Sequence, residues 1–222
     1  MEVAKGSVVL KDAEFSGNRA DIYLNTGKQI TIEETFNHNA TVACADPKDG
    51  RQLTTATTEE YQKKLNLTSA DEGYLVGYKK TEDGKEYRCL SKEVGVTISG
   101  LEGAIKAEEP AEFTVTLTHE NSTGTGTLTF GDKNGEIEYK DENGKYVPMP
   151  NDGLPIDKND YAFRITPKKA GEQTLTAAVV RDAVEVGKDS KDYTVAGRVH
   201  TTVTIEGLEN ASSKRAKART LP

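Results

Sequence analysis

Apolar and polar residues alternate along much of this chain, which is the period-two pattern of β-strands that bury one face. The clearest case is residues 113–118, where Phe113, Val115 and Leu117 alternate with threonine or glutamate neighbours. The same reading predicts four more strands in the second half of the chain, over residues 127–130, 161–166, 173–180 and 199–205. No helix of useful length is predicted there.

Two Asn-Gly pairs punctuate this second half. Asn134-Gly135 and Asn143-Gly144 both supply residues that accept the positive φ of type I′ turns, and each is flanked by apolar or aromatic residues. Two hairpins in succession predict a β-meander.

The first half of the chain shows the same pattern less cleanly. Strands are predicted over residues 8–15, 21–25, 29–34, 41–45, 74–79 and 86–91. Between them, Thr57 and Glu60 have the spacing of a capping box, and Tyr61 and Leu65 lie four residues apart. One short helical turn is therefore expected, as a connection between strands.

A short segment occurs twice. Residues 96–104 (VTISGLEGA) and 203–211 (VTIEGLENA) match at seven of nine positions with an offset of 107 residues. Self-similarity at a fixed spacing indicates repeated modules, although two short β segments can also match by chance. The offset is close to the ~100 residues of an immunoglobulin-type domain. It predicts domains at residues 1–98 and 99–208, followed by a tail at 209–222.

The first of these domains contains a Tyr-x-Cys motif. Tyr87-Arg88-Cys89 resembles the penultimate strand of immunoglobulin-like domains, in which the tyrosine hydroxyl binds nearby backbone and the cysteine bridges the two sheets. The resemblance implies a tyrosine corner at Tyr87 and a disulfide from Cys89 to Cys44. The spacing is short for such a bridge and the usual core tryptophan is absent, so two buried free thiols are the alternative.

The second domain carries a different resemblance. Residues 138–148, 161–165 and 169–176, which end in KAGEQTLT, look like the bacterial and phage immunoglobulin-like modules of surface and virion proteins. Such modules are spacers or display binding loops, and their motifs include no catalytic residues. Together the two resemblances imply an all-β chain of two tandem immunoglobulin-like β-sandwiches.

Composition narrows the classes of partner. The 222 residues carry a net charge of −7, which disfavours nucleic acid as a partner of the folded domains. No apolar run reaches the ~18 residues of a membrane span, and the first residues lack the apolar segment of a secretory signal. The tail is basic and is expected either to be solvated or to dock on a neighbouring subunit; its charges are Lys214, Arg215, Lys217 and Arg219.

Candidate chemistry is sparse. His38, His119 and His200 are far apart in sequence and match no metal-binding spacing, and no phosphate loop, dinucleotide motif or nucleophile elbow is present. Residues 132–134 and 157–160 hold side-chain oxygens that calcium accepts, but turns select Asp and Asn for their own hydrogen bonds. We therefore expect no metal, no cofactor and no catalytic site.

These expectations favour a non-enzymatic structural or binding protein. The leading hypothesis is a phage virion component, such as a head decoration, fibre or tail protein, whose partners are other capsid or tail subunits. The alternative is a set of modules from a secreted bacterial cell-surface adhesin, whose partner is a host-surface ligand. A Cys44–Cys89 disulfide would favour the adhesin, and two free thiols would favour the virion.

Overall fold

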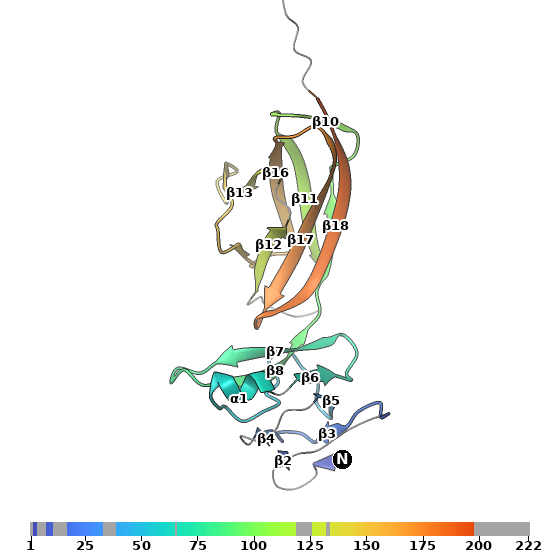
Figure 1. Ribbon diagram of the computed structural model, residues 1–222. Coiled ribbons are helices and arrows are strands. Elements are labelled where there is room, and N and C mark those ends of the chain that lie inside the picture. Colours follow the sequence, from blue (N-terminus) through green and yellow to red (C-terminus); the bar gives the residue numbers. More distant parts are fainter. Residues whose placement is uncertain are drawn as a thin grey trace, which may run out of the picture.

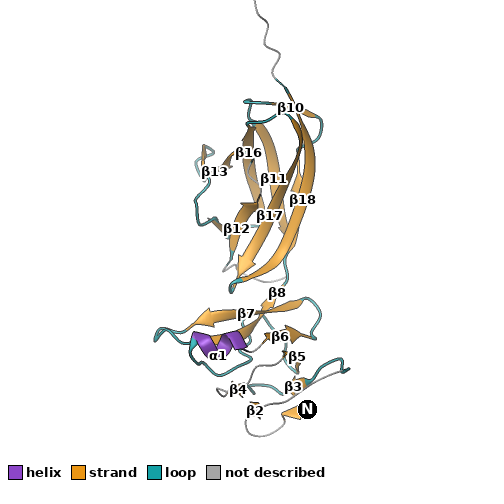
Figure 2. Cartoon of the chain, in the orientation of Figure 1, coloured by secondary structure: helices purple, strands orange, loops and turns teal. Residues whose placement is uncertain are grey.

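The chain forms two β-rich units that lie end to end in the computed structural model (Figure 1). The structure describes residues 2–3, 8–10, 17–32, 39–64, 66–118, 126–131 and 134–197. Within them, strands dominate and α1 (Glu59–Lys64) is the one helix (Figure 2). The all-β class predicted from the sequence is confirmed.

In the first unit the chain winds in successive circuits that place short strands side by side in parallel; this winding is called the coil below. Its strands are β1 (Glu2–Val3), β2 (Val8–Leu10), β3 (Ile22–Leu24), β4 (Ile30–Ile32), β5 (Asn39–Cys44) and β6 (Asn66–Ser69), followed by β7 (Tyr74–Lys80) and β8 (Glu86–Lys92). The order β1-β3-β5-β6 is parallel throughout, and β2 pairs in parallel with β4. Successive circuits of 20 to 27 residues therefore each add one strand to the first sheet, and β2 and β4 from the first two circuits form the second sheet, as in a β-solenoid.

This arrangement corrects the prediction of an immunoglobulin-like sandwich over residues 1–98, because the sheets of such a sandwich are antiparallel. The inward side chains of the coil include Ile22, Leu24, Ile30 and Val42, none of which is exposed. Alternation shows that a strand has one buried face. It does not show whether the neighbouring strand runs parallel or antiparallel.

The last circuit of the coil contains α1, and together with the antiparallel hairpin of β7 and β8 this helix covers the end of the coil. The helix begins after Thr58, whose carbonyl accepts from the amides of Tyr61 and Gln62, so the predicted helical turn is confirmed. The Gln62 side chain is fully buried and donates to the Thr55 carbonyl and the Thr57 hydroxyl. This buried amide holds the helix against the coil.

The second unit consists of two five-stranded sheets around one core. Its strands are β9 (Gly95–Ser99), β10 (Ala104–Lys106), β11 (Ala111–Thr118), β12 (Thr127–Gly131), β13 (Gly135–Lys140), β14 (Tyr146–Pro148), β15 (Leu154–Pro155), β16 (Asp160–Pro167), β17 (Gly171–Arg181) and β18 (Val184–Ala196). The sheet orders are β14-β13-β16-β11-β9 and β10-β18-β17-β12-β15. Three phenylalanines meet between the sheets, with Phe163 lying 5.3 Å from Phe113 and 4.9 Å from Phe130 between ring centroids.

The two units have separate cores, and the boundary between them falls earlier in the sequence than the predicted residue 98. Leu90 belongs to the first buried cluster and Val94 to the second. The strand β9 pairs with β11, so it is part of the second unit rather than the end of a domain at residue 98. Residues 203–211, which carry the second copy of the repeated segment, lie outside the described residues, as does the predicted strand at 199–205.

The Asn-Gly turns also differ from the prediction. Asn143-Gly144 does join two strands, β13 and β14, but Gly144 alone has a positive φ (77°), so the turn is not type I′. Asn134-Gly135 makes no hairpin, because β12 and β13 belong to different sheets. Gly135 is instead a strand residue whose Cβ would clash with the carbonyl of Thr166.

Candidate functional site

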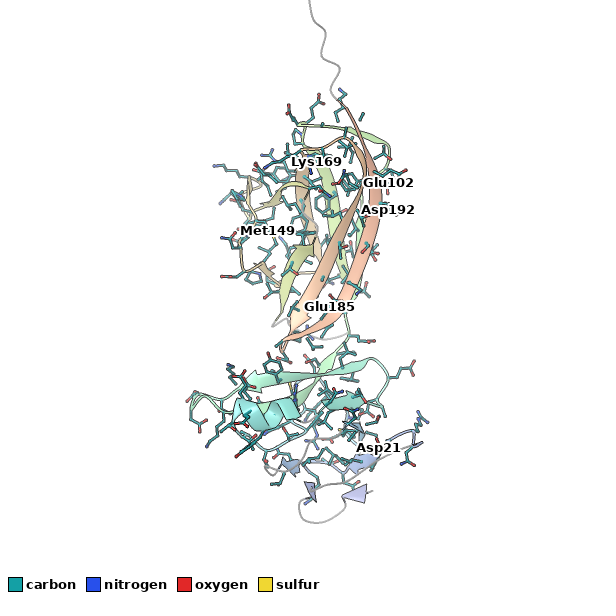
Figure 3. All side chains as sticks on the ribbon, viewed as in Figure 1. Asp21, Glu102, Met149, Lys169, Glu185 and Asp192 are labelled. Atoms are coloured by element: carbon teal, nitrogen blue, oxygen red, sulfur yellow. The ribbon has the colours of Figure 1, made fainter. Side chains whose placement is uncertain are left out.

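The most elaborate polar site that the structure describes is the junction between the two units. The hairpin of β17 and β18 points toward the first unit, and its tip meets the β7–β8 hairpin (Figure 1). At this tip Asp182 and Ala183 have φ values of 49° and 55°, which are the two positive values of a type I′ turn. Glu185, labelled in Figure 3, marks this end of the second unit.

Asp182 makes most of the contacts across the junction. Its carboxylate accepts from the Ser91 hydroxyl at 2.8 Å and lies 3.4 Å from the Lys79 ammonium group. Its backbone carbonyl accepts from the amide of Tyr78 at 2.8 Å. Burial, the largest single influence, lowers the pKa of Lys79, but the charge and hydrogen bond of Asp182, with contributions from Cys89 and Tyr87, outweigh it and raise the pKa overall. Lys79 therefore stays charged opposite Asp182.

A second ion pair lies beside the first. Arg181 is buried, with 1% of its side chain exposed, and its Nη1 donates to Asp49 Oδ2 at 3.1 Å. The other oxygen of Asp49 accepts from the backbone amide of Lys92. Next to the junction, within the second unit, the Val94 amide donates to the Val186 carbonyl at 2.8 Å. Adjacent residues of opposite charge at one hairpin tip thus bind two separate partners on the first unit.

Gly77 permits the close approach of the two units. A Cβ on Gly77 would lie 2.6 Å from the Asp182 carbonyl oxygen and 2.9 Å from Ser91 Oγ. A larger residue at this position is therefore incompatible with the observed docking. Within the second unit, Gly187 has a similar role, because a Cβ there would collide with the backbone carbonyl of Val94.

Cys89 lies at the same junction, but it is not bonded to Cys44. Both are buried free thiols, so the disulfide implied by the resemblance is not formed and the alternative of free thiols applies. Burial first, and then the charge of Asp182, raises the pKa of Cys89 to about 12. Burial and Asp71 raise the pKa of Cys44 to about 12. Neither thiol is a nucleophile at neutral pH, because the thiolate is the reactive form.

The predicted tyrosine corner at Tyr87 is replaced by a similar arrangement at Tyr161. Tyr87 lies half-buried in β8, within the unit that is not a sandwich. The Tyr161 hydroxyl accepts from the backbone amides of Asp157 and Lys158, at 2.6 and 3.0 Å, and donates to the Asp157 carboxylate. Tyr161 is at the start of β16, so it ties the preceding loop to its own strand.

In the part of the chain that the structure describes, the remaining predicted site residues form no metal cluster. Among the residues that the structure describes, no three His, Cys, Asp or Glu side chains gather as metal ligands. In the candidate calcium loop, Asp157 binds Tyr161 and Asp160 accepts from Thr116. The three histidines and the basic tail (Lys214, Arg215, Lys217 and Arg219) lie outside the described residues, as do Asp132 and Lys133. In the described part of the chain, no helix is long and apolar enough to cross a membrane.

Comparisons with known proteins assign this chain to no family. No family model and no curated protein matches the chain. A conjugative transposon lipoprotein from Bacteroides eggerthii DSM 20697 is similar over 46% of this chain and 98% of its own, with 16% identity and a TM-score of 0.36. A conjugate transposon protein from Bacteroides vulgatus matches 47% of this chain and 87% of its own at 19% identity and a TM-score of 0.34.

A superoxide reductase (neelaredoxin) from Ignicoccus hospitalis covers 47% of this chain and 80% of its own, with 16% identity and a TM-score of 0.28. All three likenesses are too weak to carry an argument about fold or function.

Proposed function

We propose that this chain is a non-enzymatic structural protein, a stiff two-unit spacer that displays a β-sandwich on the surface of a phage particle through contacts with other virion subunits. The observation that carries the proposal is the docked hairpin tip at Arg181 and Asp182. Two ion pairs, one backbone hydrogen bond and the Ser91–Asp182 hydrogen bond cross one short junction, and they fix the direction of the second unit relative to the first.

The topology of the second unit supports an immunoglobulin-like assignment for it. In such domains one sheet has the order A-B-E-D and the other contains C, F and G. The orders β9-β11-β16-β13 and β12-β17-β18 correspond to these sets. Domains of this architecture host many functions, so the assignment supports a spacer or display role only together with the junction.

The state of the cysteines favours the virion over a secreted adhesin. Two buried free thiols are compatible with assembly in a reducing cell interior, whereas disulfides are frequent in exported proteins. The location remains our proposal and is tested directly by fractionation.

The test uses antibodies against the full chain on cells that naturally produce it and on their culture supernatant. The proposal predicts that the antigen co-sediments with particles containing nuclease-protected DNA, and that gold-labelled antibody decorates those particles in electron micrographs. Antigen in the cell-surface fraction would support the adhesin instead. Antigen in the soluble cell contents alone would refute both.

A further inference from the structure

A groove opens on the flank of the second unit, away from the junction. It lies between the turn that joins β13 to β14, the short strand β15 and the loop before β16. Met149, labelled in Figure 3, marks this flank. The cavity volume is about 370 Å³, which falls within the range of roughly 300–1,000 Å³ for small-molecule sites.

The wall and floor of the groove are aromatic and aliphatic. Tyr139 and Leu154 pack on the core of the sandwich but remain half-exposed, and Pro155 is exposed beside them. Tyr161 contributes a ring whose hydroxyl is held by the amides of Asp157 and Lys158. The Tyr161 ring is therefore positioned before any ligand arrives, which lowers the entropic cost of binding.

The rim is polar and contains both donors and acceptors. Asp141 accepts from the backbone amides of Asn143 and Lys145 at 3.0 and 2.8 Å, and these bonds fix the turn that forms one side of the groove. The Asn143 side chain projects from this turn. On the opposite side, the Lys158 ammonium lies 5.2 Å from the centre of the Tyr161 ring.

The charges on the rim exclude several classes of ligand. Three carboxylates (Asp141, Glu142 and Asp157) and two ammonium groups (Lys140 and Lys158) line the groove, so its charges nearly balance and favour neither an anion nor a cation. A wholly apolar ligand would leave the charged rim without hydrogen-bond partners. A neutral ligand with one apolar face and several hydroxyl groups satisfies both the rings and the rim.

We propose that this groove binds a neutral oligosaccharide. The C–H face of a sugar ring packs on Tyr139, and its hydroxyl groups exchange hydrogen bonds with Asn143 and Lys158. This inference rests on the proposed function and deepens it, since a display protein would use such a groove to hold a surface glycan. It concerns the second unit alone.

The experiment applies the full chain to an array of neutral, sialylated and sulfated oligosaccharides. Neutral oligosaccharides that bind are then titrated, as free compounds, into the isotope-labelled full chain and followed by NMR. We expect the neutral compounds to bind and to shift the signals of Tyr139, Leu154 and Lys158. Lys158→Ala and Asn143→Ala should each weaken binding by about five- to tenfold, because each removes one hydrogen-bonding group.

Lys145→Ala is the matched control, because Lys145 belongs to the same turn but does not line the groove. It should change the affinity less than twofold. The proposal is overturned if no neutral compound binds, if only sialylated or sulfated compounds bind, or if the shifted signals lie elsewhere. If the protein is found on virions but binds no oligosaccharide, the proposed function stands and only the groove proposal is rejected. If the protein binds neutral oligosaccharides but is absent from virions, only the virion assignment is rejected.

Discussion

Gly77→Ala tests whether the junction is a tightly fitted contact. Gly77 is buried in β7, against the tip of the β17–β18 hairpin. An added Cβ would lie 2.6 Å from the Asp182 carbonyl oxygen, 2.8 Å from Asp182 Cβ and 2.9 Å from Ser91 Oγ. Ordinary carbon contacts are about 3.5–4.0 Å, so the hairpin tip must retreat by roughly half an ångström or more.

That retreat weakens two contacts at once. The Tyr78 amide loses its 2.8 Å bond to the Asp182 carbonyl, and the Asp182 carboxylate moves away from the Ser91 hydroxyl. Overpacking costs about 1–3 kcal/mol, and a hydrogen bond contributes about 0.5–1.5 kcal/mol, or up to about 3 when one partner is charged. We expect the substitution to weaken the docking by about 2–4 kcal/mol while leaving both cores intact.

Hydrogen exchange followed by mass spectrometry measures this effect where it arises. In the unsubstituted chain the amide of Tyr78 should be protected, because it donates across the junction to the Asp182 carbonyl. In Gly77→Ala its exchange should be about 30-fold faster or more, the factor that corresponds to about 2 kcal/mol. Gly131→Ala is the control, because its Cβ would meet only Thr176 Cβ, at 3.8 Å. Equal protection of the Tyr78 amide in the two variants would refute a close-fitting junction.

Three further predictions follow from buried groups. Arg181→Met should lower the free energy of unfolding by about 1–3 kcal/mol in urea titrations, because Asp49 loses its buried partner but can partly rehydrate. An unchanged free energy of unfolding would show that the ion pair contributes nothing to stability. Cys44 and Cys89 should resist alkylation in the folded protein at pH 8 and react fully in denaturant. The free energy of unfolding should fall as pH rises from about 9 toward 12, because folding raises both thiol pKa values from 9.0 to about 12. A Cys→Ala double variant that keeps the same pH profile would contradict this. Tyr161→Phe should cost about 1–2 kcal/mol in the same titrations, since two loop amides lose their acceptor.

The sequence predicts the second unit well where its strands are half-buried. Residues 113–118 and 161–166 alternate strictly, and the structure has β11 and β16 there with Phe113, Val115, Phe163 and Ile165 buried. The longest strand, β18, is missed. Over its 13 residues only Val186, Tyr193 and Val195 are buried, because much of the strand carries Lys, Asp and Ser that face solvent. Pairing with β17, rather than its own pattern, makes this segment a strand.

The coil of the first unit is harder to predict for a different reason. Its strands are short, and their partners lie one circuit away, as where Ile22 pairs with Val42 and Asn39 with Asn66. The circuits differ in sequence, so no repeat is visible at that spacing. Arg51 joins loops between these strands: its buried guanidinium group donates to the backbone carbonyls of Lys28 and Gln52. A single arginine in a polar loop carries no such signal in the sequence.

The junction could not have been predicted from local patterns at all. Asp182-Ala183 is not an expected type I′ pair, since Asn-Gly and Asp-Gly dominate such turns. Adjacent Arg181 and Asp182 read as a solvated turn until their partners, more than 90 residues away in sequence, are known. Contacts at such separation are a property of the assembled fold. The one local hint is Gly77, a glycine inside a strand, which often marks a close approach of another backbone.

The junction also explains how the open end of the coil is covered. Residues 50–57 pair with β8, and β8 pairs with β7, so β7 is the edge strand of this group. An unpaired edge strand is a site of unwanted association. The tip of β17–β18 binds the Tyr78 amide on that edge. Each unit has its own core, so loosening the junction should expose the edge of β7 without disturbing either core.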